Sequence, residues 1–292
     1  MPARARFLAT DAYRSGREWD RYAGTPQRDL FREIRERFLS RHLGGDGPVL
    51  DAGSGPGRFT PRLGGARTVR RVALDLSREM LRELRERWAD RVDAPPLPDL
   101  VVGDAARPPF PDGTFGLVAG LGNLVGFAGV DSAALLETLE RLVAPAGALV
   151  LELAPGPGER SRYFRRLPAR SVARLLRSTT ALVATRADRE GYSVEPWRKA
   201  HPSAFERTSV AELGARLERD GFRPDEVLAV APALGPDPER VRAVAGDPKA
   251  WAHLLAVEEQ LGRSPERWRS AAAVLVAATR VARPRSRAES EG

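Results

Sequence analysis

A glycine-rich stretch near residue 50 carries the residue types best suited to binding a charged small molecule. It reads Asp51-Ala-Gly-Ser-Gly-Pro-Gly-Arg58 and follows the short apolar run Val49-Leu50. Glycines in a turn between a strand and a helix let the backbone approach a ligand closely, and the first turn of the helix offers free N–H groups. Arg58 occupies the last glycine position of a dinucleotide loop, and no Gly-Lys-Ser/Thr follows as in a Walker A loop. The stretch therefore predicts a ligand-binding turn that is neither of these two loops.

Two further acids follow apolar runs in the same way. Asp75 ends the run Val72-Ala-Leu, about twenty residues after the glycines, and Asp104 comes shortly after Leu100-Val-Val. A carboxylate at the end of the second strand can accept hydrogen bonds from both hydroxyls of a ribose. This acid is equally compatible with a nicotinamide enzyme, so it does not separate the possible cofactors by itself.

The order and spacing of these segments resemble the motifs of class I S-adenosylmethionine (SAM)-dependent methyltransferases. Val49 to Gly57 is similar to the first motif of that family, an acid followed by G-x-G-x-G. The resemblance implies that the turn wraps the methionine end of SAM and that Asp51 orients around its ammonium group. The turn residues implied in cofactor binding are Gly53, Ser54, Gly55 and Gly57.

The same resemblance implies where the adenosine half of SAM lies. Asp75 would hold the ribose, and Leu76 and Met80 would flank the adenine. Asp104 would face the adenine amino group, and the backbone N–H of Ala105 would meet a ring nitrogen. Met80 serves equally well as a core residue, because methionine fills irregular apolar gaps.

Residues 107–118 resemble the loop and fourth strand of the ubiquinone/menaquinone-biosynthesis (type 11) methyltransferases. That segment normally ends in Phe-Asp, whereas here Gly116 follows Phe115. Leu121 would then line the methionine arm of the cofactor. Asn123 would either face the substrate or cap the turn.

The acceptor side is less defined by the sequence. SAM carries an activated methyl group, so the protein mainly has to align the acceptor. A base would help if the acceptor is a hydroxyl or a protonated amine, and His201, in the segment 159–207, is the candidate; a plain surface histidine is the alternative. Tyr22, with Tyr13 and Trp19, would gate the cofactor and touch the substrate, or would dock an N-terminal helix onto the core.

Alternating apolar runs and amphipathic segments predict an α/β protein. Together with the resemblance, they indicate a Rossmann-like, doubly wound, mostly parallel seven-stranded sheet with an antiparallel C-terminal strand and a small inserted lid. Expected helices span residues 26–43, 77–88, 132–143, 209–220 and 250–261. Expected strands span residues 48–51, 69–76, 100–102, 116–121, 148–153, 226–230 and 271–281.

The expected domain organisation follows from these elements. Residues 1–44 form an N-terminal helical cap and residues 45–282 the SAM-dependent methyltransferase domain. Within it, residues 159–207 form an inserted lid or substrate region, and 232–265 is a variable, proline-rich stretch. Residues 283–292 are a polar tail that we expect to be disordered.

The composition limits the compartment and the partners. A net charge of +8 would suit nucleic-acid binding. However, nearly all of the basic residues are arginines, and these are interleaved with acids, as in Arg32-Glu-Ile-Arg-Glu-Arg37. The absence of cysteine excludes disulfides, thiolate zinc sites and thiol nucleophiles. No metal-ligand pattern, membrane-spanning run or signal peptide is found, so we expect a cytoplasmic protein.

The sequence thus predicts a SAM-dependent methyltransferase that acts on an N, O or C atom of a small-molecule acceptor. An RNA or protein methyltransferase is the alternative that the basic charge favours. A nicotinamide-dependent oxidoreductase and a non-catalytic SAM-binding protein are the remaining readings, and Arg58 and the motif order disfavour them.

Overall fold

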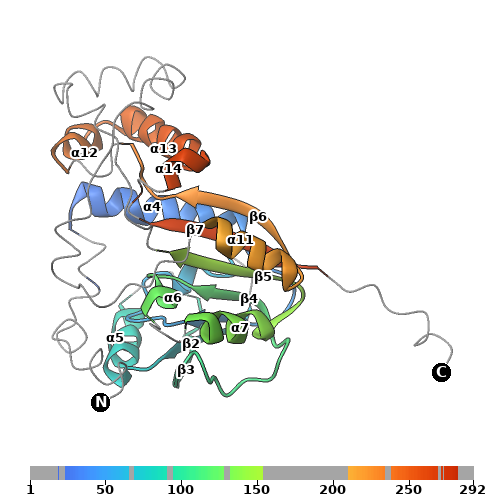
Figure 1. Cartoon of the computed structure of the whole chain (residues 1–292). Coiled ribbons are helices and arrows are strands. Elements are labelled where there is room, and N and C mark those ends of the chain that lie inside the picture. The colour runs from blue at the N-terminus through green and yellow to red at the C-terminus, as the bar shows by residue number, and fades with distance from the viewer. Residues whose placement is uncertain are drawn as a thin grey trace, which may run out of the picture.

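Within the residues that the structure describes, seven strands form a single sheet in the order β3-β2-β1-β4-β5-β7-β6 (Figure 1). The computed structural model describes residues 19, 24–65, 69–90, 95–127, 132–153, 210–233, 238–268, 271 and 273–281. The strands are β1 (Val49–Ala52), β2 (Arg71–Asp75), β3 (Asp99–Val102), β4 (Phe115–Gly120), β5 (Val143–Leu153), β6 (Phe222–Ala229) and β7 (Val274–Arg280).

All neighbouring strands run parallel except β7, which is antiparallel to both β5 and β6. The predicted seven-stranded, mostly parallel sheet with an antiparallel C-terminal strand is therefore confirmed. The strand order reverses between β1 and β4. In open α/β sheets, ligands bind outside the carboxyl ends of the strands at such a reversal.

Helices cover both faces of the sheet, as the alternation of side chains along the strands requires. Val49 of β1 packs in a core shared with α4 (Pro26–Arg41), α12 (Pro238–Ala245) and α13 (Pro248–Gly262). Leu50, the next residue, packs in the opposite core with α6 (Leu124–Phe127), α7 (Ser132–Leu142) and α11 (Val210–Arg219). The α4 face also carries α5 (Arg78–Ala89), whose residues pack on Ala73 of β2. A short helix, α14 (Pro265–Trp268), precedes β7.

Helix starts follow local rules that the sequence carries. The hydroxyl of Ser77 accepts from the backbone N–H of Met80, so the predicted cap of α5 is confirmed. Thr25 caps α4 in the same way, and Asp247 caps α13. The predicted apolar stripe of α4, which includes Leu30 and Ile34, is fully buried.

The proline-rich stretch 232–265 contains the helix expected at 250–261, which is α13, and a second core helix, α12, that the sequence did not predict. Val241 and Val244 of α12 are fully buried. Pro238 and Pro248 are the first residues of these helices, where a missing N–H costs nothing. These prolines start helices rather than break them, which the sequence pattern did not distinguish.

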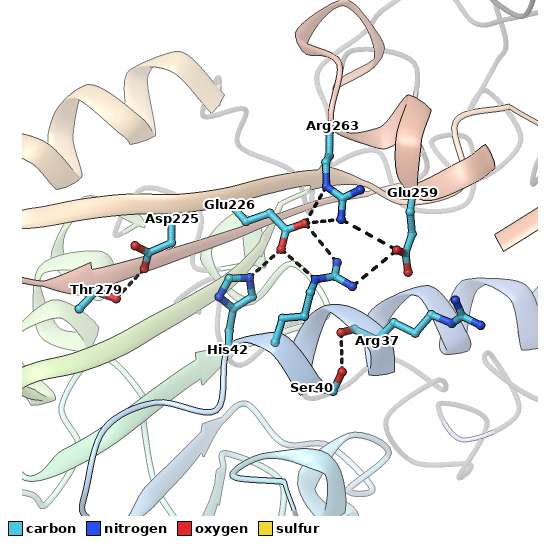
Figure 2. A network of polar contacts seen from close by, with 9 residues as sticks. Arg37, Ser40, His42, Asp225, Glu226, Glu259, Arg263 and Thr279 are labelled. Carbon is cyan, nitrogen blue, oxygen red and sulfur yellow. Dashed lines mark hydrogen bonds and ion pairs between the residues drawn. The ribbon is translucent and has the colours of Figure 1, made fainter. Parts of the chain in front are cut away.

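A polar network ties the far edge of the sheet to two helix ends (Figure 2). Glu226 of β6 accepts from Arg41 at 3.1 Å, from His42 at 2.8 Å and from Arg263 at 3.2 Å. His42 and Arg263 are the C-terminal caps of α4 and α13. Burial raises the pKa of Glu226, but the hydrogen bonds from Arg41 and His42 outweigh it and hold the pKa below its ordinary value. Glu226 therefore fastens both helices to β6.

In the part of the chain that the structure describes, no helix has the length and apolar character needed to cross a bilayer.

Candidate functional site

A buried carboxylate lies at the carboxyl end of β1. Asp51 is 4% exposed, and its Oδ2 accepts a hydrogen bond from Thr60 Oγ1 at 2.5 Å. Burial raises the pKa of Asp51 to about 7; the Thr60 hydrogen bond lowers it and the nearby Asp75 raises it. A bound cation would favour the ionised form. Asp51 is thus suited to receive an ammonium group, and Thr60, which sequence reasoning missed, orients it.

A second carboxylate holds the glycine turn against the end of β2. Asp75 Oδ2 accepts from the N–H of Gly55 at 2.8 Å, and Oδ1 accepts from the N–H of Ser77 at 2.8 Å. The N–H groups of Gly53 and Ser54 also bond to the carbonyl of Leu74. Burial raises the pKa of Asp75, although both backbone hydrogen bonds lower it. Each carboxylate oxygen keeps further acceptor capacity, so ribose hydroxyls could still donate to Asp75.

The glycine turn is closed on one side and open on the other. A Cβ on Gly57, whose φ is +75°, would lie 2.5 Å from Leu84 Cγ of α5. Gly57 therefore allows α5 to pack against the turn. At Gly55, by contrast, no described atom lies within 4 Å of an added Cβ. The open side at Gly55 is where the backbone can approach a ligand.

Exposed apolar side chains lie where the resemblance places an adenine ring. Leu76 and Val102, which follow and end the neighbouring strands β2 and β3, are 41% and 51% exposed. Asp104 lies beyond β3, and its Oδ1 accepts from the N–H of Ala106 at 2.9 Å. Two apolar surfaces beside a carboxylate suit a flat ring that carries an amino group.

Two of the predicted adenine-site residues are more deeply buried than Leu76 and Val102. Met80 is 1% exposed, one turn into α5, and Ala105 is 8% exposed in the turn after β3. The side chain of Met80 therefore belongs to the interior of the described structure. Its role beside the adenine remains a prediction.

The turn after β4 is held by a residue that sequence reasoning missed. Leu121 and Asn123 are each 7% exposed, and Asn123 has a φ of 62°. Between them, Gly122 donates its N–H to Glu152 Oε2 at 3.2 Å. Glu152 is itself paired with Arg35 of α4, 117 residues away, so no local pattern could have indicated it.

Arg58, the residue that distinguishes the turn from a dinucleotide loop, contacts the N-terminal segment. Its guanidinium carbon lies 4.0 Å from the centre of the Trp19 ring, and that of Arg87 lies 4.5 Å from the same centre. Arg58 Nη2 also donates to the carbonyl of Trp19. The side chain of Trp19 thus lies against two cations next to the glycine turn.

Several predicted features lie outside the described residues. They are Tyr22 with Tyr13, His201 with the segment 159–207, and the tail 283–292. Within the described residues there is no group of three or more acids and histidines arranged to hold a metal ion.

Taken together, the carboxyl ends of β1, β2 and β3 carry two buried acids and two exposed apolar side chains. Their chemistry would suit the ammonium, ribose and adenine of SAM. Residues 49–147 also match the family model described as a methyltransferase domain, and no curated protein sequence matches the chain. Residues 49–147 are therefore similar to a methyltransferase domain, a class of enzyme that takes its methyl group from SAM.

Solved structures with the same fold are distant in sequence. A Haloferax volcanii methyltransferase in complex with the Trm112 methyltransferase activator has a TM-score of 0.54 at 18% identity, covering 92% of this chain and 96% of that one. A Burkholderia thailandensis 1,6-didemethyltoxoflavin-N1-methyltransferase with bound S-adenosylhomocysteine (SAH) has a TM-score of 0.52 at 17% identity, covering 95% and 87%. Geranyl diphosphate C-methyltransferase from Streptomyces coelicolor A3(2) has a TM-score of 0.50 at 18% identity, covering 85% and 76%. These likenesses show a shared fold.

Proposed function

We propose that this protein transfers the methyl group of SAM to a small-molecule acceptor in the crevice at the carboxyl ends of β1, β2 and β4. The observation that carries the proposal is the placement of two buried acids in the neighbouring strands β1 and β2, Asp51 and Asp75, with Asp75 bound to the N–H of Gly55 in the open glycine turn. Two of the similar structures are methyltransferases whose substrates, 1,6-didemethyltoxoflavin and geranyl diphosphate, are small, which supports a small acceptor.

In this proposal the residues of the chain bind and orient, while the cofactor supplies a methyl group already activated as a sulfonium. Asp51, held by Thr60, binds the ammonium group, and Asp75 accepts from the ribose hydroxyls. Leu76 and Val102 flank the adenine, and Asp104 and the N–H of Ala105 meet its polar edge. Alignment of the acceptor with the methyl group then lowers the barrier.

Leu121 lines the methionine arm and Asn123 faces the acceptor. Tyr22 and His201 are proposed to complete the acceptor side, His201 as a base if the acceptor atom carries a proton to be removed. Replacing His201 with alanine should then lower turnover and leave SAH binding intact.

Titration calorimetry with SAH tests the cofactor assignment directly. Wild-type protein should bind SAH saturably and should not bind NADH. Asp75→Ala should weaken SAH binding by at least about tenfold, because it removes the acceptor for the ribose and for the N–H of Gly55. Asp99→Ala is the matched control, since Asp99 pairs with Arg70 at the exposed start of β3.

The outcomes separate the possible cofactors. Retained SAH binding in Asp99→Ala and its loss in Asp75→Ala would justify a screen of acceptors by SAH formation. Binding of NADH without binding of SAH would mean that the turn serves a nicotinamide cofactor, and the proposal would be abandoned.

A further inference from the structure

A buried ion pair lies on the α4 face at the carboxyl end of β5. Arg35 Nε donates to Glu152 Oε2 at 3.0 Å and Arg35 Nη2 donates to Oε1 at 2.6 Å. The two residues are 4% and 3% exposed. Arg35 Nη1 also donates to the carbonyl of Phe31 at 2.9 Å, which fixes the guanidinium against its own helix. The pair is thus rigid and shielded from water.

Glu152 of this pair contacts the turn after β4, which lies in the proposed cofactor site. Gly120 pairs with Leu151, so Glu152 lies one residue further along β5, at the level of Leu121. Its Oε2 accepts from the N–H of Gly122 at 3.2 Å. Gly122 and Asn123 both have left-handed backbone conformations, with φ of 64° and 62°. Glycine and asparagine tolerate this conformation better than other residues, so the turn has a defined backbone course that the hydrogen bond to Glu152 can fix.

Stability alone does not account for this pair. Removing two charges from water costs several kcal/mol per ion, and apolar residues of similar volume often replace a buried pair with no loss of stability. What apolar residues cannot provide is an acceptor at a fixed point for the N–H of Gly122. The pair therefore fixes the position of the N–H of Gly122, and with it the turn.

We propose that Glu152, held by Arg35, is a positioning residue for the cofactor site. It fixes the N–H of Gly122 and thereby the course of Leu121 and Asn123 beside the methionine arm. Because Arg35 belongs to α4, the position of α4 also affects the geometry of the site. The inference rests on the proposed function, because this turn lines a cofactor arm only if SAM lies in the crevice.

Two double variants separate the effect of the hydrogen-bond acceptor at position 152 from the effect of the ion pair. Arg35→Met/Glu152→Gln and Arg35→Met/Glu152→Met both remove the ion pair, and only the first keeps a side-chain carbonyl for the N–H of Gly122. Both should unfold in urea with stabilities similar to each other. SAH affinity should stay within about threefold of wild type in the first and fall roughly tenfold in the second, the loss expected for one hydrogen bond.

Glu226→Gln is the control, because it removes an ion-pair carboxylate that lies outside the proposed cofactor site. Glu226 fastens α4 and α13 to the edge strand β6 (Figure 2), so this variant should lower stability and leave SAH affinity unchanged. Equal SAH affinity in the two double variants, whether near wild type or reduced, would overturn the inference. A fall in affinity in Glu226→Gln as large as in the Met variant would also overturn it, because stability alone would then explain the loss.

Hydrogen exchange at the amide of Gly122 gives a second readout that does not need the cofactor. The amide should be protected in wild type and in the Gln double variant and should exchange faster in the Met double variant. Arg35→Leu/Glu152→Leu offers the same comparison if the Met variant does not fold. If wild-type protein does not bind SAH, the proposed function fails, while equal exchange rates in the variants would overturn the positioning role of Glu152 independently.

Discussion

Among the individual residues, Asp51 is buried, and its proposed ligand, the ammonium group of SAM, requires it to be ionised. Its carboxylate has Thr60 as a hydrogen-bond donor and Asp75 as a neighbouring acid. Because burial dominates, folding favours the protonated form of Asp51. The folded pKa lies near 7, against an ordinary value of 3.8. The protein therefore binds this proton more tightly when folded than when unfolded, and the stability that it contributes is lost as the pH rises.

Asp51→Asn should remove this dependence on pH. Wild-type protein should lose stability relative to the variant as the pH rises from about 5 to about 8, by about 2–3 kcal/mol, and the difference should level off above the folded pKa. Urea unfolding of both proteins across this range measures it. A difference that is constant with pH, or one that grows toward acid, would contradict the buried, protonatable state of Asp51.

The sequence could predict the acids of the crevice but not their partners. Asp51, Asp75 and Asp104 each follow an apolar run, and parallel strands bring their carboxyl ends to one edge of the sheet. Glu152 and Arg35 meet only because α4 packs across β5, a contact that depends on the whole fold. The order of residues along the chain carries no local signal of such a contact.

At the level of elements, the connection before β1 explains why Gly116 replaces the acid expected in type 11 enzymes. Residues 44–48 pass directly over the start of β4: Gly45 donates its N–H to the carbonyl of Gly116, and Gly116 donates to the carbonyl of Pro48. A Cβ on Gly116 would lie 2.5 Å from the carbonyl oxygen of Asp46. No side chain fits between the connection and the strand.

Gly116→Ala should therefore be strongly destabilising, by about 3 kcal/mol or more, because backbone has to move to admit one methyl group. The control is Gly214→Ala in α11, where nothing lies within 4 Å of the added Cβ. That change should be neutral or stabilising by roughly 0.5–1 kcal/mol. Thermal or urea unfolding compares the two, and similar stabilities for both variants would show that the connection does not pack as described.

Local pattern predicted most elements, and its failures have physical causes. Helix α4 and strands β1 to β4 lie where periodicity and caps placed them. Helix α12 was missed because prolines at helix starts resemble those of loops. Strand β6 begins at Phe222, earlier than predicted, because an edge strand tolerates Pro224 beside a register shift.

For the whole molecule, the net charge of +8 is dispersed. On the described helices, arginines pair with acids one turn away, as Arg32 does with Glu36, Arg82 with Glu86 and Arg87 with Glu83. Cations already paired within a helix contribute less to phosphate binding than a clustered patch would.

We therefore expect weak binding of nucleic acid. A short single-stranded RNA should bind with a Kd weaker than about 10 μM at about 150 mM salt, as measured by fluorescence anisotropy. Tighter binding that weakens steeply with added salt would contradict this expectation and favour the alternative of an RNA methyltransferase.

The position of β7 between β5 and β6 has a consequence for the order of assembly. Strands β1 to β5 come from one continuous stretch, residues 49–153, and can pair with one another as soon as that stretch is synthesised. Strand β6 leaves the ribosome before β7, yet among the described residues its sheet hydrogen bonds are to β7 alone. It must therefore wait for a later strand. During that interval the outer side of β5 is an unpaired edge, which is the state of this fold most open to pairing with another chain.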